Sequence, residues 1–334
     1  MDERPTCKAR ELTPFALVAF GLPFLMGIPL GIAQKAGYAT DAFANAQMFY
    51  PAAGAMLALL LAGRGEALPR RLFGFYFVCT AAMAACCLGV LAAPAVGWLL
   101  VCSLVIIAAS VVAWVLLLTH KKAAREAAGL RWHGGAKALG YVALFLLLRT
   151  ATVFASMAAA GQLGEYLAYW TTAAPWVMML TLVPNFFLSF LPFFGEEYGW
   201  RYFLQPRLQS RFGLRGGVLL LGVLWGLWHL PLNFFFYAPD TALQSVASQL
   251  VTCVCYSVFF AWAYMKTQNI WVPVLMHFFN NNMILVYAGT TDAAVISGQT
   301  VGWGDVLVQL ALFGAAFLPF LAAKTFRSGK SDAA

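Results

Sequence analysis

Acidic and histidine side chains gather in one part of a sequence that is otherwise largely apolar. Glu196 and Glu197 are adjacent, Arg201 follows them, and His229 and His277 come further along the chain. A carboxylate and two imidazoles can pass protons to and from water or a substrate, or they can hold a metal ion. Ionisable groups are costly inside a membrane, so this group predicts a functional site if its elements cross one.

The spacing of these residues predicts which side chains share a helix face. Glu197 and Arg201 are four residues apart, so the guanidinium can pair with that carboxylate. Glu196 lies about 100° further round the helix and is left free for chemistry. Trp225 and His229 are also four residues apart, which places an indole one turn from the imidazole.

The last part of the set combines a histidine with amides. His277 and Asn281 are four residues apart and are expected to project into the same volume, with Asn280 and Asn282 beside them. A purely structural interpretation also exists for each group. Glu196 could be a buried acid neutralised by Arg201, and the histidines and asparagines could form hydrogen bonds between helices.

The composition predicts the elements that position these residues. The chain has 334 residues, of which 62% are hydrophobic and 10% charged, and its mean hydropathy is +0.77. An ordinary soluble domain carries about 25% charged residues, and a membrane-spanning helix needs about 20 apolar ones. The sequence therefore predicts an all-α, polytopic bundle of about ten transmembrane helices. The predicted spans are 15–34, 43–63, 72–93, 97–119, 138–158, 176–204, 217–237, 243–265, 269–289 and 303–323.

The net charge of +8 predicts topology rather than a nucleic-acid partner. Of the 21 Lys and Arg residues, Arg149 falls within a span and Lys35 alone lies on the side opposite the N-terminus. The other 19 flank the spans on one side, which the positive-inside rule assigns to the cytosol. Both termini are therefore expected there, in contact with anionic membrane lipid. The tails carry Arg4, Lys8, Arg10, Lys324, Arg327 and Lys330.

One membrane domain is expected over 1–334, with a core at 175–290 and N-terminal helices at 1–160 that carry no recognisable motif. The span 176–204 is expected to end near Pro206, because proline cannot continue a helix. Counted from the cytosolic ends of their spans, Glu196, His229 and His277 then lie about 15, 18 and 12 Å deep. The three side chains are therefore predicted to meet in the cytosol-facing half of the membrane.

Three motifs in this order resemble a known family. Glu196 to Arg201 matches E-E-x-x-x-R, Trp225 to His229 resembles F-x-x-x-H, and His277 to Asn281 matches H-x-x-x-N. On separate membrane helices they resemble the CPBP family (CAAX proteases and bacteriocin-processing proteins, the Abi family) of intramembrane endopeptidases. The likeness covers about 175–290. Trp225 departs from the family, which usually has Phe there, but it preserves an aromatic wall.

The resemblance implies hydrolysis of peptide bonds near the cytosolic side of the membrane. The roles that it implies are a general base (Glu196), a group that holds water or substrate (His229), stabilisers of the oxyanion (His277 and Asn281), a supporting ion pair (Glu197 and Arg201) and an aromatic wall (Trp225). The expected substrates are peptides or proteins tethered to the membrane, including prenylated CAAX chains. The protein is expected to be an integral multi-pass membrane protein, of the plasma membrane if its host is a bacterium.

Cofactor use and two other functions stay open at this point. No cofactor is firmly implied, but two histidines and a glutamate form a legitimate zinc set, which would be Glu196, His229 and His277. Both a metalloprotease and a metal-free, glutamate-dependent enzyme therefore fit. A transporter could use the same residues as a proton relay. A non-catalytic immunity or assembly protein could retain the helices without turnover.

Overall fold

The computed structural model describes residues 9–63 and 67–327, and within these residues it contains helices and no strand. The predicted all-α class is confirmed. The backbone of a membrane span must satisfy its hydrogen bonds internally, and helices do so within one segment. Four of the basic residues used in the charge argument lie outside the described residues: Arg4, Lys8, Arg64 and Lys330.

Sixteen α-helices make up the described chain, several of them joined by short π-helical or 3₁₀ segments. The α-helices are α1 (Ala9–Ala16), α2 (Leu22–Lys35), α3 (Asp41–Gln47), α4 (Tyr50–Leu61), α5 (Arg70–Ala92), α6 (Trp98–Thr119), α7 (Lys122–Ala127), α8 (Gly135–Ala159), α9 (Leu163–Trp170), α10 (Ala174–Ser189), α11 (Leu191–Glu197), α12 (Gln205–Trp228), α13 (Leu230–Leu232), α14 (Ala242–Thr267), α15 (Trp271–Ala288) and α16 (Trp303–Phe317). The π-helical segments are η1 (Leu17–Gly21), η2 (Tyr198–Leu204) and η3 (Asn233–Tyr237), and the 3₁₀ segments are η4 (Pro239–Thr241), η5 (Ala293–Ile296), η6 (Leu318–Ala322) and η7 (Lys324–Phe326).

The number of candidate membrane spans is lower than the ten that the sequence predicts. Eight helices of the described chain are long and apolar enough to cross a membrane, or nine if α9 and α10, which are bent by 62°, count as one span. The difference has two causes. Parts of the predicted spans 176–204 and 217–237 belong to one helical segment, Leu191–Tyr237. Helix α15 holds a histidine and three asparagines in 18 residues and is less apolar than the eight.

The helical segment Leu191–Tyr237 folds back on itself at Gly213. Gly213 has φ 75° and ψ 165°, a conformation that side chains disfavour. A Cβ on Gly217 would lie 2.5 Å from the backbone nitrogen of Gln209, so only glycine permits the return arm to start this close. The two arms then pack against each other, and the rings of Trp200 and Trp228 meet at 5.4 Å.

The expectation that a helix ends near Pro206 is wrong. The π-helical segment η2 comes just before it, and the backbone N–H of Gln205 donates to the carbonyl of Trp200, five residues back. Pro206 then occupies one of the first two positions of α12, where a missing N–H disrupts little. The chain reverses at Gly213 instead.

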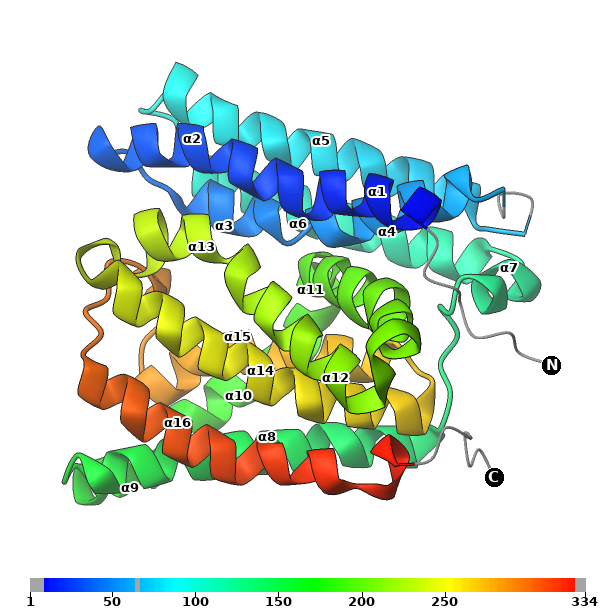
Figure 1. Cartoon of the computed structure of the whole chain (residues 1–334). Coiled ribbons are helices and arrows are strands. Elements are labelled where there is room, and N and C mark those ends of the chain that lie inside the picture. Colours follow the sequence, from blue (N-terminus) through cyan, green and yellow to red (C-terminus); the bar gives the residue numbers. More distant parts are fainter. Residues whose placement is uncertain (1–8, 64–66, 328–334) are drawn as a thin grey trace.

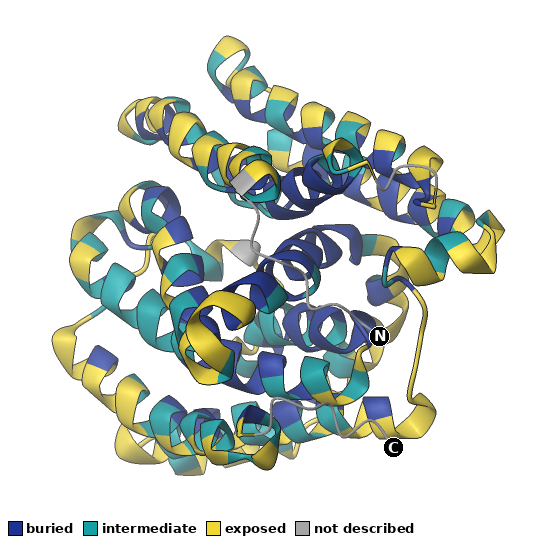
Figure 2. Ribbon diagram, turned by 45° about the vertical axis from the view of Figure 1, so that its right-hand side comes forward, coloured by how far each residue is buried: buried dark blue, intermediate teal, exposed yellow. Residues whose placement is uncertain are grey.

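The helices that carry the polar residues lie in the middle of the bundle. Figure 1 shows α11, α14 and α15 between the N-terminal helices α1 to α6 on one side and α8, α9 and α16 on the other. Within its most apolar stretch, Leu191–Tyr237 is 56% buried inside the protein, compared with 22% for α8. Figure 2 shows the same contrast, with buried residues on the inner helices and exposed ones on the outward faces. The apolar outer surface fits an integral, multi-pass membrane protein.

Basic residues gather at one end of the bundle. Arg207 pairs with Glu11 near the start of α1, and the Nε of Arg215 donates to the carbonyl of Leu321 at 3.1 Å. The start of α1, the turn of the hairpin and the end of the described chain therefore lie together, while α2 ends at the opposite end (Figure 1). Which end faces the cytosol stays a prediction from the sequence.

Candidate active site

Two adjacent carboxylates form the centre of the candidate site. Glu196 and Glu197 end α11 and are almost fully buried, with 2% and 0% of their surfaces exposed. The return arm of Leu191–Tyr237 brings Trp225 to Glu196, with His229 beside Trp225, and α15 packs against α11 and brings His277 to Glu197. The two arms of Leu191–Tyr237 and helix α15 therefore meet at one pair of acids, whereas the sequence predicts three separate spans.

Glu197 joins a closed ionic network. Its Oε2 lies 3.1 Å from the Nε of Arg201 on the same helical segment, which confirms the pairing predicted from their spacing. Its Oε1 lies 2.8 Å from the Nδ1 of His277 on α15. Both oxygens of Glu197 are therefore engaged, one within its own helical segment and one across to another helix.

Arg201 is fully buried and is held by aromatic rings as well as by Glu197. Its guanidinium lies 4.7 Å from the ring centre of Trp225 and 5.2 Å from that of Phe260. The Nη atoms have no hydrogen-bond partner among the described residues. Stabilisation by the ring faces therefore takes the place of hydrogen bonds for this cation.

Glu196 has one occupied oxygen and one free oxygen. Its Oε2 accepts hydrogen bonds from the indole N–H of Trp225 at 2.8 Å and from that of Trp200 at 3.3 Å. Its Oε1 has no hydrogen-bond partner within the described residues. The two indoles fix the carboxylate in place, and Oε1 is left to accept a proton.

The two histidines are oriented in the same way. The Nδ1 of His229 lies 2.8 Å from the carbonyl of Trp225, and the Nδ1 of His277 lies 2.8 Å from Glu197. In the described chain neither Nε2 has a hydrogen-bond partner. Trp225 lies next to both rings, with centroid distances of 6.3 Å to His229 and 5.6 Å to His277. Each ring is therefore held through Nδ1 and keeps Nε2 for another molecule.

Asn281 stands apart from this cluster. It lies one turn beyond His277 on α15 and is half-buried, and its Oδ1 accepts a hydrogen bond from Asn280 at 3.0 Å. The hydrogen bonds of the described chain join Asn281 to neither glutamate nor histidine. The predicted catalytic role of Asn281 stays a prediction.

The side chains that the structure describes do not form a metal site as they are arranged. Among the residues that the structure describes, no three His, Cys, Asp or Glu side chains lie close enough together to hold a metal ion. This includes the zinc set predicted from the sequence, Glu196, His229 and His277. The occupied oxygen of Glu196 accepts from two indoles instead.

The sequence underrates both tryptophans. Trp225 is expected only as an aromatic wall, yet it makes the shortest hydrogen bond to Glu196, which a phenylalanine could not make. Trp200 is not predicted as a site residue at all. A signal for it was present, because Trp200 lies four residues after Glu196 and so shares its helix face.

Comparisons with known proteins agree with this location. Residues 178–283 match the family model described as type II CAAX prenyl endopeptidase Rce1-like. A curated protein of Methanococcus maripaludis, named CAAX prenyl protease 2, is 27% identical over 161 residues, which cover 46% of this chain and 59% of that protein. No solved structure matches the chain.

The matched segment contains the complete polar cluster. Residues 178–283 include both glutamates, both histidines and Asn281. The helices before α10 lie outside the family match. The resemblance predicted from the three motifs is thus supported by a family model over 178–283, the segment that contains all three motifs.

Proposed function

We propose that this member of the CPBP family is an intramembrane endopeptidase in which Glu196 activates water. The observation that carries the proposal is the state of its carboxylate, which is buried, held at one oxygen by two indoles and free at the other. A general base must be fixed in position and must keep an acceptor for the proton that it removes.

The first step is attack by water. Glu196 Oε1 takes a proton from water as the oxygen attacks the carbonyl carbon of the scissile bond. Because the Nδ1–H of His229 donates to a backbone carbonyl, its Nε2 is an acceptor when the ring is neutral, and it can hold the second water proton. The result is a tetrahedral intermediate with a negative oxygen.

The intermediate needs hydrogen-bond donors. A protonated His277 donates through Nδ1 to Glu197 and retains its Nε2–H for the oxyanion. The amide of Asn281, one turn away, is the second donor in this proposal. With Glu196 protonated, the negative charges of Glu197 and the oxyanion face one guanidinium and one imidazolium, so the cluster with its intermediate is neutral overall. Collapse breaks the C–N bond, and the proton on Glu196 passes to the leaving amine.

The burial of the site and the name of one relative support the proposed substrate class. Helices surround the acids in the middle of an apolar bundle, so a substrate must reach them from within or beside the membrane. The matched relative is named as a CAAX prenyl protease, which supports membrane-tethered peptides, prenylated CAAX chains among them, as substrates. The charge distribution of the sequence predicts presentation from the cytosolic side.

Cleavage by the reconstituted full-length chain tests this proposal. Internally quenched peptides that end in a CAAX sequence, with and without a prenyl group, are incubated with the protein in lipid nanodiscs, and the products are identified by mass. We expect endoproteolytic cleavage that Glu196→Gln abolishes and Glu165→Gln leaves unchanged, since Glu165 is an exposed acid on α9. Equal cleavage by all three proteins would contradict the proposal. If the unmodified chain cleaves no peptide but carries protons across proteoliposomes, and Glu196→Gln abolishes this flux, a transporter would be favoured.

A further inference from the structure

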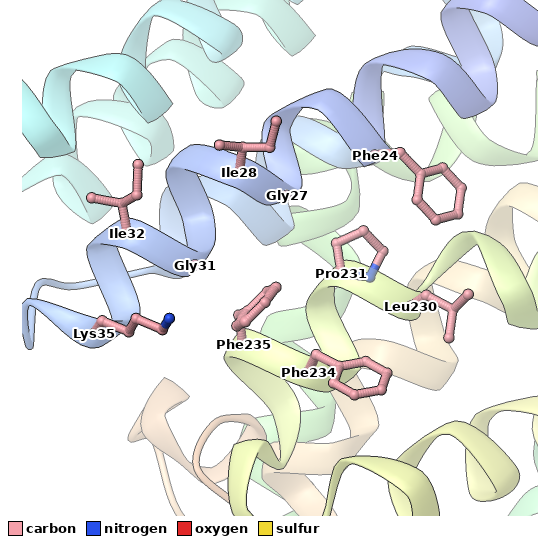
Figure 3. A pocket seen from close by; sticks show the side chains of 10 residues that line it. All are labelled: Phe24, Gly27, Ile28, Gly31, Ile32, Lys35, Leu230, Pro231, Phe234 and Phe235. Carbon is pink, nitrogen blue, oxygen red and sulfur yellow. The ribbon is translucent and has the colours of Figure 1, made fainter.

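An apolar groove separate from the acidic cluster runs along α2. It has a volume of about 450 Å³ and lies between α2 and the segment formed by α13 and η3. Of the ten residues that line it, nine are apolar or glycine, and Lys35 is the only charged one. In Figure 3, Lys35 and Phe24 lie at opposite ends of the groove, both on α2.

Two glycines on α2 allow the opposite wall to come close. A Cβ on Gly27 would lie 3.1 Å from Pro231, and one on Gly31 would lie 3.2 Å from the ring of Phe235. The glycines are four residues apart and so occupy one face of the helix. The groove is therefore shaped by close packing at its base, and it opens outward between larger side chains such as Phe24 and Phe234.

The open side of the groove faces the membrane. Phe24, Ile28 and Ile32 are exposed apolar residues of a helix long and apolar enough to span a bilayer. Hydrocarbon chains of lipid are the molecules that meet such a surface. The distance from Phe24 to Lys35 along α2 is about 16 Å, from 11 residues at 1.5 Å each. Half of the hydrocarbon layer is about 15 Å thick, so the groove is as long as one acyl chain.

Lys35 gives the groove a charged end. Its side chain is exposed and forms no ion pair with any described residue. It is also the one basic residue that the sequence places on the side opposite the N-terminus. The ammonium thus lies where the phosphate of a lipid would lie if its acyl chain occupied the groove.

We propose that this groove binds one anionic phospholipid, with an acyl chain between α2 and η3 and the headgroup phosphate at Lys35. Charge complementarity favours an anionic headgroup over a zwitterionic one, whose own amine competes with the lysine. One lysine near a membrane surface corresponds to about a fivefold preference. None of the residues that line the groove is among those proposed for peptide cleavage, so the proposal does not rest on the peptidase activity.

Photo-crosslinking of the full-length chain in nanodiscs tests the proposal. The probes are phosphatidylglycerol and phosphatidylcholine that carry a diazirine near the end of one acyl chain, and adducts are mapped by mass spectrometry. We expect phosphatidylglycerol adducts concentrated at 24–32 and 230–235, about fivefold above those from phosphatidylcholine. Adducts spread equally over the exposed face of α6, or an equal yield from both lipids, would overturn it.

Matched variants separate the groove from its charge. Lys35→Gln should remove the headgroup preference, while Lys266→Gln should not, although both lysines lie in the last turn of a helix. Ile28→Trp should fill the groove and abolish the adducts there. Leu104→Trp, at an exposed position on α6 outside the groove, should leave them unchanged. Adducts at 24–32 and 230–235 that survive Ile28→Trp would contradict lipid binding in the groove.

Discussion

Glu196 and Glu197 are adjacent residues of the same type, but they differ in how many of their carboxylate oxygens are engaged by other side chains. On one side, Glu197 uses both oxygens, for Arg201 and for His277. On the other side, Glu196 uses one oxygen for two indoles, and its second oxygen has no hydrogen-bond partner among the described residues. One step of about 100° round a helix thus separates a carboxylate engaged in structure from one available for chemistry.

The groups around the two acids differ as well. Glu197 pairs with the buried guanidinium of Arg201, so removing the carboxylate leaves a buried charge uncompensated. The partners of Glu196 are neutral N–H donors that orient the carboxylate without cancelling its charge. Two variants of one residue type should therefore fail in different ways, one in activity and the other in stability.

The largest effect is expected at Glu196. Glu196→Gln keeps the shape and an oxygen for the indoles but cannot accept the proton of water at neutral pH. We expect kcat to fall roughly 10²–10⁴-fold, the usual contribution of a general base, with unchanged thermal unfolding. Peptide cleavage and unfolding are measured on the same nanodisc preparation. Retained activity, or a loss that only follows unfolding, would remove the distinction between the two acids.

The next largest effect is expected at Glu197, whose two oxygens are both engaged. Glu197→Gln leaves Arg201 buried without its carboxylate and should lower the free energy of unfolding by about 3–5 kcal/mol. Equilibrium unfolding in detergent micelles gives this value. The double variant with Arg201→Met should recover much of the loss, because neither charge then remains. A single variant as stable as the unmodified chain would show that the network is not structural.

A substitution of Asn281 tests whether a residue further along α15 takes part in the chemistry at Glu196. If its amide stabilises the oxyanion, Asn281→Ala should lower kcat about 10²-fold with little change in KM. Asn282→Ala is the matched control, since that amide donates to the carbonyl of Phe278 on its own helix. Equal losses in the two variants would place Asn281 among the structural amides.

The smallest effect is expected from the indole donors. Trp225→Phe keeps a ring beside Arg201 and the histidines but removes the 2.8 Å hydrogen bond to Glu196. One hydrogen bond to a charged group corresponds to about a tenfold fall in kcat. Trp200→Phe removes the longer bond, at 3.3 Å, and should cost less. If Trp225→Phe retains full activity, the ring alone is what matters at this position.

The sequence predicts those parts of the site that lie within one turn of a helix. Helix geometry predicts that Glu197 pairs with Arg201 and that Glu196 points away from this pair. The apolar runs around these residues predict that their side chains are buried. The hydrogen bond from Trp225 to Glu196 depends on how two arms of a hairpin rotate against each other. Spacing along one helix carries no information about that rotation.

In the fold, too, the features set by neighbouring residues are predictable, and those set by contacts between distant residues are not. The helices and their apolar faces are predictable from composition and run length. The continuation past Pro206 and the reversal at Gly213 are not, because the π-helical turn before the proline and the close packing of Gly217 on Gln209 decide them. The contact of His277 with Glu197 joins residues 80 positions apart and likewise needs the folded chain.

The most direct test of the central claim is an experimental structure of the Glu196→Gln variant with an intact peptide bound in nanodiscs. We predict that the scissile carbonyl carbon lies between two groups: the side-chain atom of residue 196 that takes the place of Glu196 Oε1, and the Nε2 of His277. A water molecule is expected near His229. A peptide held elsewhere on the bundle, with its scissile bond out of reach of residue 196, would contradict the account.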